Sequence, residues 1–401
     1  MGKGKSSAAI NLMNRGGRYI YVTPLLTECD RIVRACGFYQ PMDDERSKLS
    51  DLKRLLSEGK SVAMTHVLFS LFDYKCRELV SRLGYTLIVD EAFNVYDGIA
   101  ISSDDLSMLL ANYIDSVPRP DFGRGVSSLV WRKDCMSYAG TFESLKQRIL
   151  LGNVYLKTVG NQRVLIQILH PENLRVFDRV IFLTYLWEGQ LQRTYLDFFN
   201  FQQKRLYVSS SGDSYEFCED PCEPDEGGAA FRDLIRVVDS PKLNDIGAEE
   251  TDLCKNWYIK NRALLPELRK HMRSFFERRG SYPADCGRDK GKYRLWSTFK
   301  DYERVIAGSP PRYADSYLYL GARASNDYVD AVNLAYLCNL YANPAMLNFF
   351  EGTERIDNDL YALSMMIQWI WRSAIRVGNP INLYLPSARM RELLSDWLER
   401  S

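Results

Sequence analysis

The sequence predicts an α/β protein built from doubly wound parallel sheets, and three observations carry this prediction. The chain has 401 residues with 46% hydrophobic side chains, which is enough for two or three domains with full cores. Its first third alternates short apolar runs with helical patterns, as expected for strand–helix–strand units. The run YTLIV at residues 85–89 has no polar alternation, which is typical of a strand covered on both faces.

The composition excludes several classes of protein. Lys and Arg number 52 against 51 Asp and Glu, for a net charge of +1, so the chain is neither a polybasic tail protein nor mostly disordered. No apolar run approaches the roughly 18 residues that a membrane span needs, and the N-terminus does not resemble a signal peptide. The nine cysteines are scattered, and Cys218 and Cys222 lack the second pair of a zinc site. We therefore expect reduced thiols, a cytoplasmic location and no membrane partner.

The expected elements of the first half follow from local signals. We expect helices over residues 5–14, 26–36 and 68–83, and strands over residues 18–23, 62–64, 85–89, 164–169 and 180–184. Gly16 and Gly37 end the first two helices, because glycine readily adopts the left-handed conformation that closes a helix. Pro24 ends the first strand.

Changes in charge divide the chain into domains. Residues 209–228 are acidic, with no Lys or Arg between Asp213 and Glu226, which indicates an exposed linker. Residues 255–304 are basic and interleaved with aromatic residues. This stretch either holds a nucleic-acid backbone and its bases or forms amphipathic helices with buried rings. We predict a first domain over residues 1–205, an acidic linker over 206–254, and a second domain with a basic-aromatic insertion over 255–401.

A phosphate-binding pattern lies at the start of the sequence. The run GKGKS, beginning at Gly2, matches the second half of the pattern G-x-x-x-x-G-K-[ST]. In such a loop backbone N–H groups face phosphate oxygens, the lysine reaches the β- and γ-phosphates, and the hydroxyl binds Mg²⁺. Lys5 and Ser6 take the last two roles, and Gly4 and Ser7 complete the loop with Gly2. The strand that enters such a loop is missing, so we expect the first domain to lack its N-terminal strand.

An apolar strand that ends in two acids supplies the second pattern. Asp90 and Glu91 follow the run LIV and precede Ala92 and Phe93. Beside a phosphate loop, a carboxylate at a strand end can hold Mg²⁺ through water, and its neighbour can polarise an attacking water. We assign these roles to Asp90 and Glu91 respectively. The alternative is a strand followed by an acidic turn.

Together these patterns resemble motifs I and II of superfamily 2 helicases of the DEAD/DEAH type, and further segments resemble that family in order. They are YVTP at 21–24 (motif Ia), Thr65-His66 (a strand-contacting motif), LTY at 183–185 (motif III), residues 295–300 (motif IV), residues 321–328 (motif V) and residues 368–376 (motif VI). The last two segments, with residues 334–344, are similar to helicase-like proteins of bacteriophages and integrative mobile elements.

The resemblance implies two tandem RecA-like domains that bind ATP and Mg²⁺ in the cleft between them. It implies a nucleic-acid-dependent ATPase, a DNA helicase or translocase of phage or mobile-element replication, acting in a bacterial or phage-infected cell. Single-stranded DNA or a duplex junction is the implied partner, with replication or mobile-element proteins beside it. The residues implied to contact nucleic acid are Thr23, Pro24, Thr65, His66, Thr298, Arg323 and Asn326.

The last motif also has a helical pattern of its own. Asp357 can cap a helix that begins at residue 358 and ends at Gly378. On such a helix Gln368, Arg372 and Arg376 share one side, opposite an apolar face. One amide and two guanidinium groups suit a γ-phosphate that reaches across a cleft, so we predict catalytic roles for all three. The alternative is a solvated polar face of a helix packed on the core.

Two rival functions stay open. A packaging-type motor ATPase also needs a phosphate loop and an acid pair, but it does not need the segments around Arg323 and Gln368. A degenerate or truncated module could bind DNA or a partner protein without catalysis, because half of the phosphate loop is missing.

Overall fold

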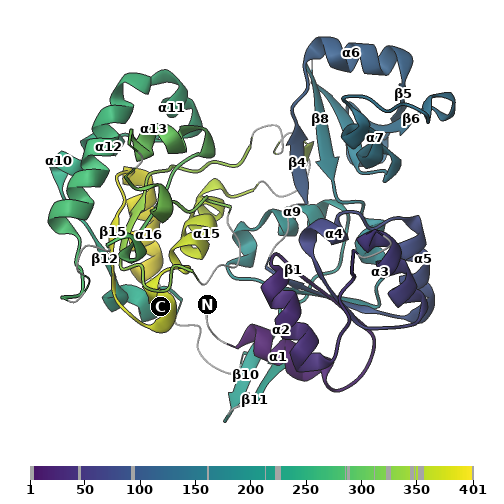
Figure 1. Cartoon of the computed structure of the whole chain (residues 1–401), viewed down its shortest axis with the longest axis horizontal. Helices are drawn as coiled ribbons and strands as arrows, with labels where there is room; N and C mark the ends of the chain where they lie inside the picture. The colour runs from purple at the N-terminus through teal and green to yellow at the C-terminus, as the bar shows by residue number, and fades with distance from the viewer. Residues whose placement is uncertain are drawn as a thin grey trace.

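The protein has two parallel four-stranded sheets and, beside the first, a five-stranded antiparallel sheet (Figure 1). The computed structural model describes residues 4–43, 47–91, 95–159, 162–212, 214–221, 227–284, 286, 290–310, 312–321, 327–343, 347, 349–350 and 356–399. Each parallel sheet has helices on both faces, so the predicted doubly wound α/β class is confirmed. Within these residues no strand precedes the first helix, and none of the helices is both long and apolar enough to cross a membrane.

The first sheet has the order β2-β1-β3-β9, with all strands parallel. Its strands are β1 (Tyr19–Thr23), β2 (Val62–Thr65), β3 (Thr86–Asp90) and β9 (Arg179–Leu183). Helices α1 (Lys5–Met13) and α2 (Leu26–Cys36) cover one face, and α3 (Lys48–Ser57) and α5 (Tyr74–Leu83) cover the other. Leu87 and Ile88 of β3 therefore point into two different cores, which explains why the strand is apolar without alternation.

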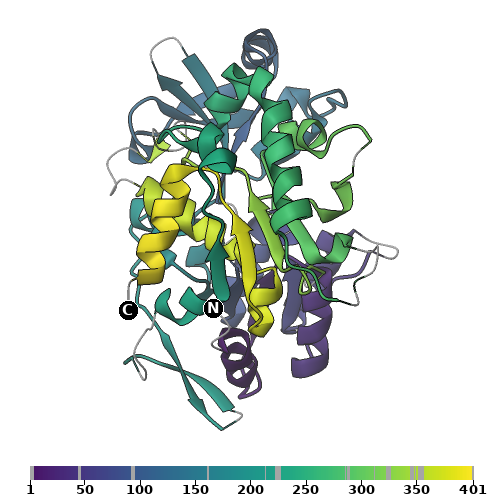
Figure 2. The ribbon, with the colours of Figure 1, turned by 90° about the vertical axis from the view of Figure 1, so that its left-hand side faces the viewer.

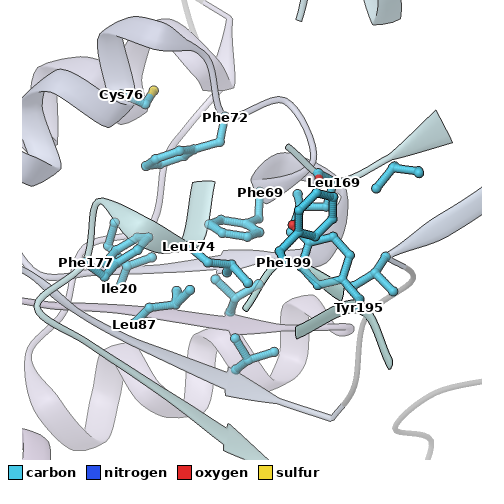
Figure 3. Packing of buried hydrophobic residues seen from close by; sticks show 14 of the residues in the cluster. Ile20, Phe69, Phe72, Cys76, Leu87, Leu169, Leu174, Phe177, Tyr195 and Phe199 are labelled. Carbon is cyan, nitrogen blue, oxygen red and sulfur yellow. The ribbon is translucent and has the colours of Figure 1, made fainter. Parts of the chain in front are cut away.

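The core between this sheet and α5 is rich in aromatic rings (Figure 3). Phe72 stacks on Phe177 with 6.1 Å between ring centroids. The hydroxyl of Tyr195, in α9 (Leu191–Phe198), donates to the Leu169 carbonyl at 2.8 Å. This bond ties α9 to the segment that leads through α8 (Glu172–Arg175) into β9.

The second sheet, in the other half of the chain, is also parallel and four-stranded but has a different strand order (Figure 2). Its order is β12 (Ile235–Val237), β15 (Ile381–Tyr384), β14 (Asn333–Tyr336) and β13 (Arg294–Ser297), all parallel. Helices α15 (Asn358–Ile370) and α16 (Ala388–Glu399) cover one face. The other face packs against α11 (Lys255–Lys260), α12 (Leu265–Ser274) and α13 (Glu303–Ala307), with α10 (Pro241–Asn244) nearby.

The antiparallel sheet is inserted between β3 and β9, and the sequence did not predict it. Its order is β4 (Tyr96–Ile99), β8 (Gln162–Ile168), β7 (Val154–Val159), β6 (Val126–Trp131) and β5 (Ile114–Pro118). The predicted strand at 164–169 was assigned to the parallel sheet, which is wrong, because it is part of β8. Leu165 and Ile166 are both apolar because Leu165 packs against α6 (Ser103–Asn112) and α7 (Glu143–Leu150), whereas Ile166 packs against the first domain.

One aromatic cluster joins a segment from the second half of the chain to the first domain and to the inserted sheet. Phe349 and Phe350 come from the second half of the chain and are buried in the core of the first. The ring centroid of Phe350 lies 5.3 Å from that of Phe198 in α9 and 6.2 Å from that of Tyr96 in β4. Phe349 contacts Tyr155 of β7 at 6.3 Å. These contacts hold the second domain against both α9 and the inserted sheet.

Several expected elements have different bounds. The elements predicted at 5–14, 18–23, 26–36, 62–64, 85–89 and 180–184 are confirmed to within one residue. The single helix expected over 68–83 is instead α4 (His66–Phe69) followed by α5, because the Asp73 carboxylate caps α5 by accepting the Cys76 N–H at 3.1 Å. The segment expected as a linker contains the hairpin of β10 (Tyr207–Ser211) and β11 (Ser214–Cys218), and also β12. The second domain therefore begins before residue 255.

The basic-aromatic stretch contributes its rings to the core of the second domain. Trp257, Tyr258, Phe275, Phe276 and Trp296 are all buried there. Rings in such positions cannot stack on bases. The interpretation as amphipathic helices with buried aromatics therefore holds for these five residues, and the exposed basic side chains of the stretch can still meet a polyanion.

The substitution Phe349→Ala should destabilise the protein. It leaves a cavity where a fully buried ring joined two domains, and such truncations lose about 3–5 kcal/mol of unfolding free energy. Urea unfolding of the whole chain measures the loss. Val377→Ala, at a side chain that is 61% exposed, is the matched control and should change stability by less than about 0.5 kcal/mol. A similarly small loss for Phe349→Ala would show that the cluster does not hold the domains together.

Candidate active site at the domain interface

The predicted acid pair lies where β3 ends. Asp90 is the last residue of the strand, and Glu91 follows it with a φ of 59°. A positive φ is uncommon for a residue other than glycine and is maintained only where the surroundings enforce it, often at functional sites. The Glu91 N–H donates to the Leu183 carbonyl of β9 at 3.2 Å, so the strained residue is held to the neighbouring strand.

Glu91 forms an ion pair with Arg372 of the second domain. The Arg372 Nη2 donates to the Glu91 Oε1 at 2.7 Å. The Arg372 side chain is 6% exposed and that of Glu91 is 23% exposed. The pair is nevertheless unsaturated, because the buried Glu91 Oε2 and Arg372 Nε have no hydrogen-bond partner. A buried guanidinium and carboxylate with free positions are suited to a further charged or polar ligand.

Helix α15 delivers Arg372 to this position. The Asp357 side chain accepts the Asp359 and Leu360 N–H groups, as the sequence predicted. The predicted apolar face is also confirmed, because Leu363, Met366, Ile367, Ile370 and Ala374 are all buried.

The expected end of this helix at Gly378 is wrong, because α15 ends at Ile370. Arg376 lies in a separate 3₁₀ turn (Ala374–Val377) and is exposed, so it does not share a helix side with Arg372. The Gln368 amide donates to the Ser364 hydroxyl at 3.3 Å. Gln190 of the first domain also binds Ser364, so this part of α15 serves the domain interface.

The carboxyl group of Asp90 is buried on the face of the sheet that α1 and α2 cover. Burial raises its pKa to about 7, with further raising by the negative charges of Glu91 and Glu28. Tyr21 and the Arg31 guanidinium, which is held by Glu28 at 2.9 Å, oppose this rise. None of these three neighbours was predicted from the sequence to act at the site. Glu28 and Arg31 stand three residues apart in α2, a spacing that places both on one helix face and was the available signal.

The nucleic-acid positions predicted in the first domain lie along the same edge of the sheet. Thr23 and Thr65 are neighbours in the register of β1 and β2, and Pro24 follows Thr23. Thr65 caps α4 by accepting the Leu68 N–H at 3.3 Å. Thr23 is fully buried and its hydroxyl has no partner. The His66 Nε2 lies 3.1 Å from the Asp90 carbonyl oxygen. The structure therefore brings these positions next to the acid pair.

The remaining predicted nucleic-acid positions are not gathered in this way. Thr298 is fully buried, and its hydroxyl binds the Tyr258 hydroxyl at 3.0 Å. This burial argues against a direct contact with a phosphate. Arg323 and Asn326 lie outside the described residues, as does Gly2 of the phosphate loop.

The phosphate-loop residues that the structure describes are at the N-terminus of α1. Gly4 caps the helix with a φ of 72°, and Lys5, Ser6 and Ser7 form its first turn. The Lys5 ammonium lies 6.0 Å from the centroid of the Tyr185 ring, which follows β9. The Tyr215 ring of β11 lies against Gly4, where a Cβ atom would collide with it. The helix N-terminus is thus at the same end of the sheet as Asp90.

The residues present fit a nucleotide with Mg²⁺. Asp90 has a buried carboxyl group with a raised pKa, and a nearby cation would favour its ionised form. Ser6 offers a hydroxyl at a helix terminus that favours anions. Within the described residues, no group of three or more His, Cys, Asp or Glu side chains is arranged to hold a metal ion. Mg²⁺ would therefore depend on Ser6, Asp90 and the phosphates themselves.

These features define a class: an α/β protein with two tandem RecA-like parallel-sheet domains and an ionic contact between them. Residues 229–398 match the family described as "YonV C-terminal Rossmann-like domain". The SPbeta prophage-derived uncharacterized protein YonV of Bacillus subtilis (strain 168) is 33% identical over 418 residues, covering 100% of this chain and 97% of that protein. The chain belongs to the YonV family.

Two solved structures share a loose likeness of shape with the chain. "Structure of S. tokodaii Xpd4" has a TM-score of 0.45 and 12% identity, over 98% of this chain and 91% of that one. A structure titled "XPD_Helicase" has a TM-score of 0.44 and 11% identity, over 98% of this chain and 93% of that one. At values this low neither structure assigns a function to the chain.

The substitution Asp90→Asn should change how stability depends on pH. The folded pKa of about 7 lies above the value of about 4 for an unfolded aspartate. In the wild type the stabilisation from protonating Asp90 is therefore fully present below about pH 4 and lost as the pH rises through about 7. Asparagine is neutral throughout, so the variant should gain stability relative to the wild type on going from about pH 5 to about pH 8, by about 3 kcal/mol, because each of the two pH units below the folded pKa is worth about 1.4 kcal/mol.

Urea unfolding at both pH values measures this gain. Asp97→Asn, at an exposed position of β4, is the matched control, and its difference from the wild type should stay small at both values. A difference between Asp90→Asn and the wild type that does not change with pH would contradict the burial of the Asp90 carboxyl group.

A double-mutant cycle should measure the ion pair itself. Arg372→Met leaves the Glu91 carboxylate without its partner and should lower the unfolding free energy by about 3–5 kcal/mol. Adding Glu91→Gln removes the unpaired charge, so the double variant should lose less than the sum of the single losses. Urea unfolding of the four proteins gives the coupling energy. Additivity to within about 0.5 kcal/mol would show that the contact carries no energy.

Proposed function

We propose that this protein is a nucleic-acid-dependent ATPase of the helicase or translocase type. One observation carries the proposal: Arg372 of the second domain binds Glu91 of the first at 2.7 Å, next to the buried Asp90. An acid pair at a strand end, with an arginine supplied from a second domain, is an arrangement suited to phosphoryl transfer to water. Hydrolysis coupled to the closing of two domains can move a bound strand.

The roles follow from the chemistry of each group. Gly4, Lys5, Ser6 and Ser7 would hold the phosphates at the N-terminus of α1, and Ser6 and Asp90 would hold Mg²⁺, which neutralises phosphate charge when bound. Glu91 would accept the proton of the attacking water. Arg372 would stabilise the charge that develops on the γ-phosphate.

Two buried polar atoms of the domain interface that have no hydrogen-bond partner support this proposal. The Glu91 Oε2 and the Arg372 Nε are both buried without a partner, so each retains capacity for water or phosphate oxygen. Arg372 lies directly after the end of α15 at the domain interface, whereas Arg376 lies on an exposed turn. Arg372 is therefore the better candidate for the catalytic arginine. Gln368 stays a predicted catalytic residue of the same site.

Nucleic acid would bind along the edge of the first sheet that carries Pro24 and Thr65. These residues lie beside the acid pair, so a strand held there can influence hydrolysis. In the second domain, Arg323, Asn326 and exposed basic residues of the 255–304 stretch would continue the path through backbone contacts. The prophage origin of the YonV relative supports DNA as the substrate and phage or mobile-element replication as the setting.

Three variants test the function. Lys5→Ala, Glu91→Gln and Arg372→Ala should each abolish ATP turnover, and loss of a catalytic arginine typically lowers the rate by about 10³–10⁵-fold. Glu91→Gln and Arg372→Ala should still bind nucleotide, because neither residue is assigned to holding it. Phosphate release with and without single-stranded DNA measures turnover, and a fluorescent nucleotide analogue measures binding.

Arg54→Ala is the matched control, since this surface arginine is paired with Asp51 and Glu58 on α3, and it should keep wild-type turnover. Near-normal turnover by Arg372→Ala would remove the catalytic role of that arginine. A wild-type chain that binds DNA but releases no phosphate would favour a non-catalytic binding module. A packaging-type motor would instead require duplex DNA for stimulation.

A further inference from the structure

His66 lies between the acid pair and the edge of the first sheet at which nucleic acid is proposed to bind. It is the first residue of α4, directly after β2, and its Nε2 lies 3.1 Å from the carbonyl oxygen of Asp90. A carbonyl oxygen can only accept a hydrogen bond, so the ring must carry its proton on Nε2 and donate it. The side chain that was predicted from the sequence to contact nucleic acid is therefore directed at the main chain of the acid pair.

The bond acts on one particular peptide group. The carbonyl of Asp90 and the N–H of Glu91 belong to the same planar peptide unit. The N–H donates to the Leu183 carbonyl of β9 at 3.2 Å, and the carbonyl accepts from His66. The unit is thus held from both sides, at the point where Glu91 has a φ of 59°. Any rotation of this peptide changes where the Glu91 carboxylate points.

The segment that carries His66 is open to a ligand. Thr65 caps α4, and Val67, which follows His66 in α4, has an exposed fraction of 74%. An exposed apolar side chain beside a strand end offers a surface on which a base can pack. A nucleic-acid strand bound there would contact α4, and His66 is the residue of α4 that hydrogen-bonds to the main chain of the acid pair.

We propose that His66 is a positioning residue that holds the Asp90–Glu91 peptide in its catalytic orientation. Through this hydrogen bond, nucleic-acid binding at α4 would change the orientation of the Glu91 carboxylate. This inference rests on the proposed ATPase function. It assigns His66 an effect on the rate of hydrolysis rather than on the affinity for nucleic acid. Because a misplaced catalytic group can lower a rate by about 100-fold, the effect is measurable.

Two substitutions at the same position test the proposal. His66→Leu keeps an apolar body but removes the donor, whereas His66→Gln keeps an N–H at a similar reach. With saturating oligodeoxythymidine, His66→Leu should lower kcat for ATP by about 10- to 100-fold and leave the KM for ATP and the oligonucleotide affinity within about twofold. His66→Gln should recover most of the rate. In hydrogen–deuterium exchange, the Glu91 amide should exchange faster in His66→Leu than in His66→Gln.

His170 provides the matched control, because it is also partly buried and its Nδ1 accepts a main-chain N–H, that of Glu172, at 3.2 Å. His170→Leu should keep wild-type kcat. Loss of oligonucleotide affinity with unchanged kcat in His66→Leu would overturn the proposal and make His66 a nucleic-acid contact. An equal loss of rate in His66→Gln and His66→Leu would also overturn it. If the wild type has no ATP turnover, the proposed function fails, and unchanged Glu91 exchange in His66→Leu would then overturn the positioning role separately.

Discussion

The contact between Glu91 and Arg372 is the constraint on which the rest of the molecule depends. Removing a carboxylate and a guanidinium from water costs several kcal/mol for each ion, and a single hydrogen bond of 2.7 Å leaves the buried Glu91 Oε2 and Arg372 Nε unused. Such an ion pair is maintained only if contacts elsewhere hold the two domains together. The aromatic cluster around Phe349 and the contact of Gln190 with Ser364 supply that packing. The uncompensated cost of removing these two charges from water falls at the proposed reaction centre, where a phosphate or a water could offset it.

Much of the first domain could be predicted because its signals are local. The bounds of β1, α2 and β3 follow from apolar runs and from Pro24 and Gly37, and the acid pair follows from its place after a strand. The inserted sheet could not be predicted in this way. Leu165 and Ile166 of its strand β8 are both buried, one in each of two layers, and adjacent apolar residues are also typical of a strand in a parallel sheet. The sequence alone does not show which elements form the two layers that bury these residues.

The end of α15 shows how a non-local contact overrides a local pattern. Apolar residues at helical spacing continue to Ala374, which is indeed buried. The Ala374 N–H, however, donates to the Ala331 carbonyl at 3.0 Å, so the main chain leaves the helix to bind the segment before β14. Arg372 is consequently in the break and reaches Glu91, whereas Arg376 does not join it. The raised pKa of Asp90 also has a non-local origin, because burial is its main cause and Glu28 and Arg31 approach the carboxyl group only through the packing of α2 on the sheet.

The position of the inserted sheet has a consequence for how the chain folds. Strands β3 and β9 are hydrogen-bonded neighbours, yet Asp90 and its partner Leu183 are separated by about 90 residues, and closing so long a loop is entropically unfavourable. Pairings of this kind slow folding, because the loop must close before the contact stabilises anything. Strands β5 to β8 of the inserted sheet pair with their neighbours along the chain and can form from nearby contacts, and β4 then pairs with β8 across the insertion. Once folded, it brings the ends of β3 and β9 together, so the first parallel sheet would be completed late, after the module inside it.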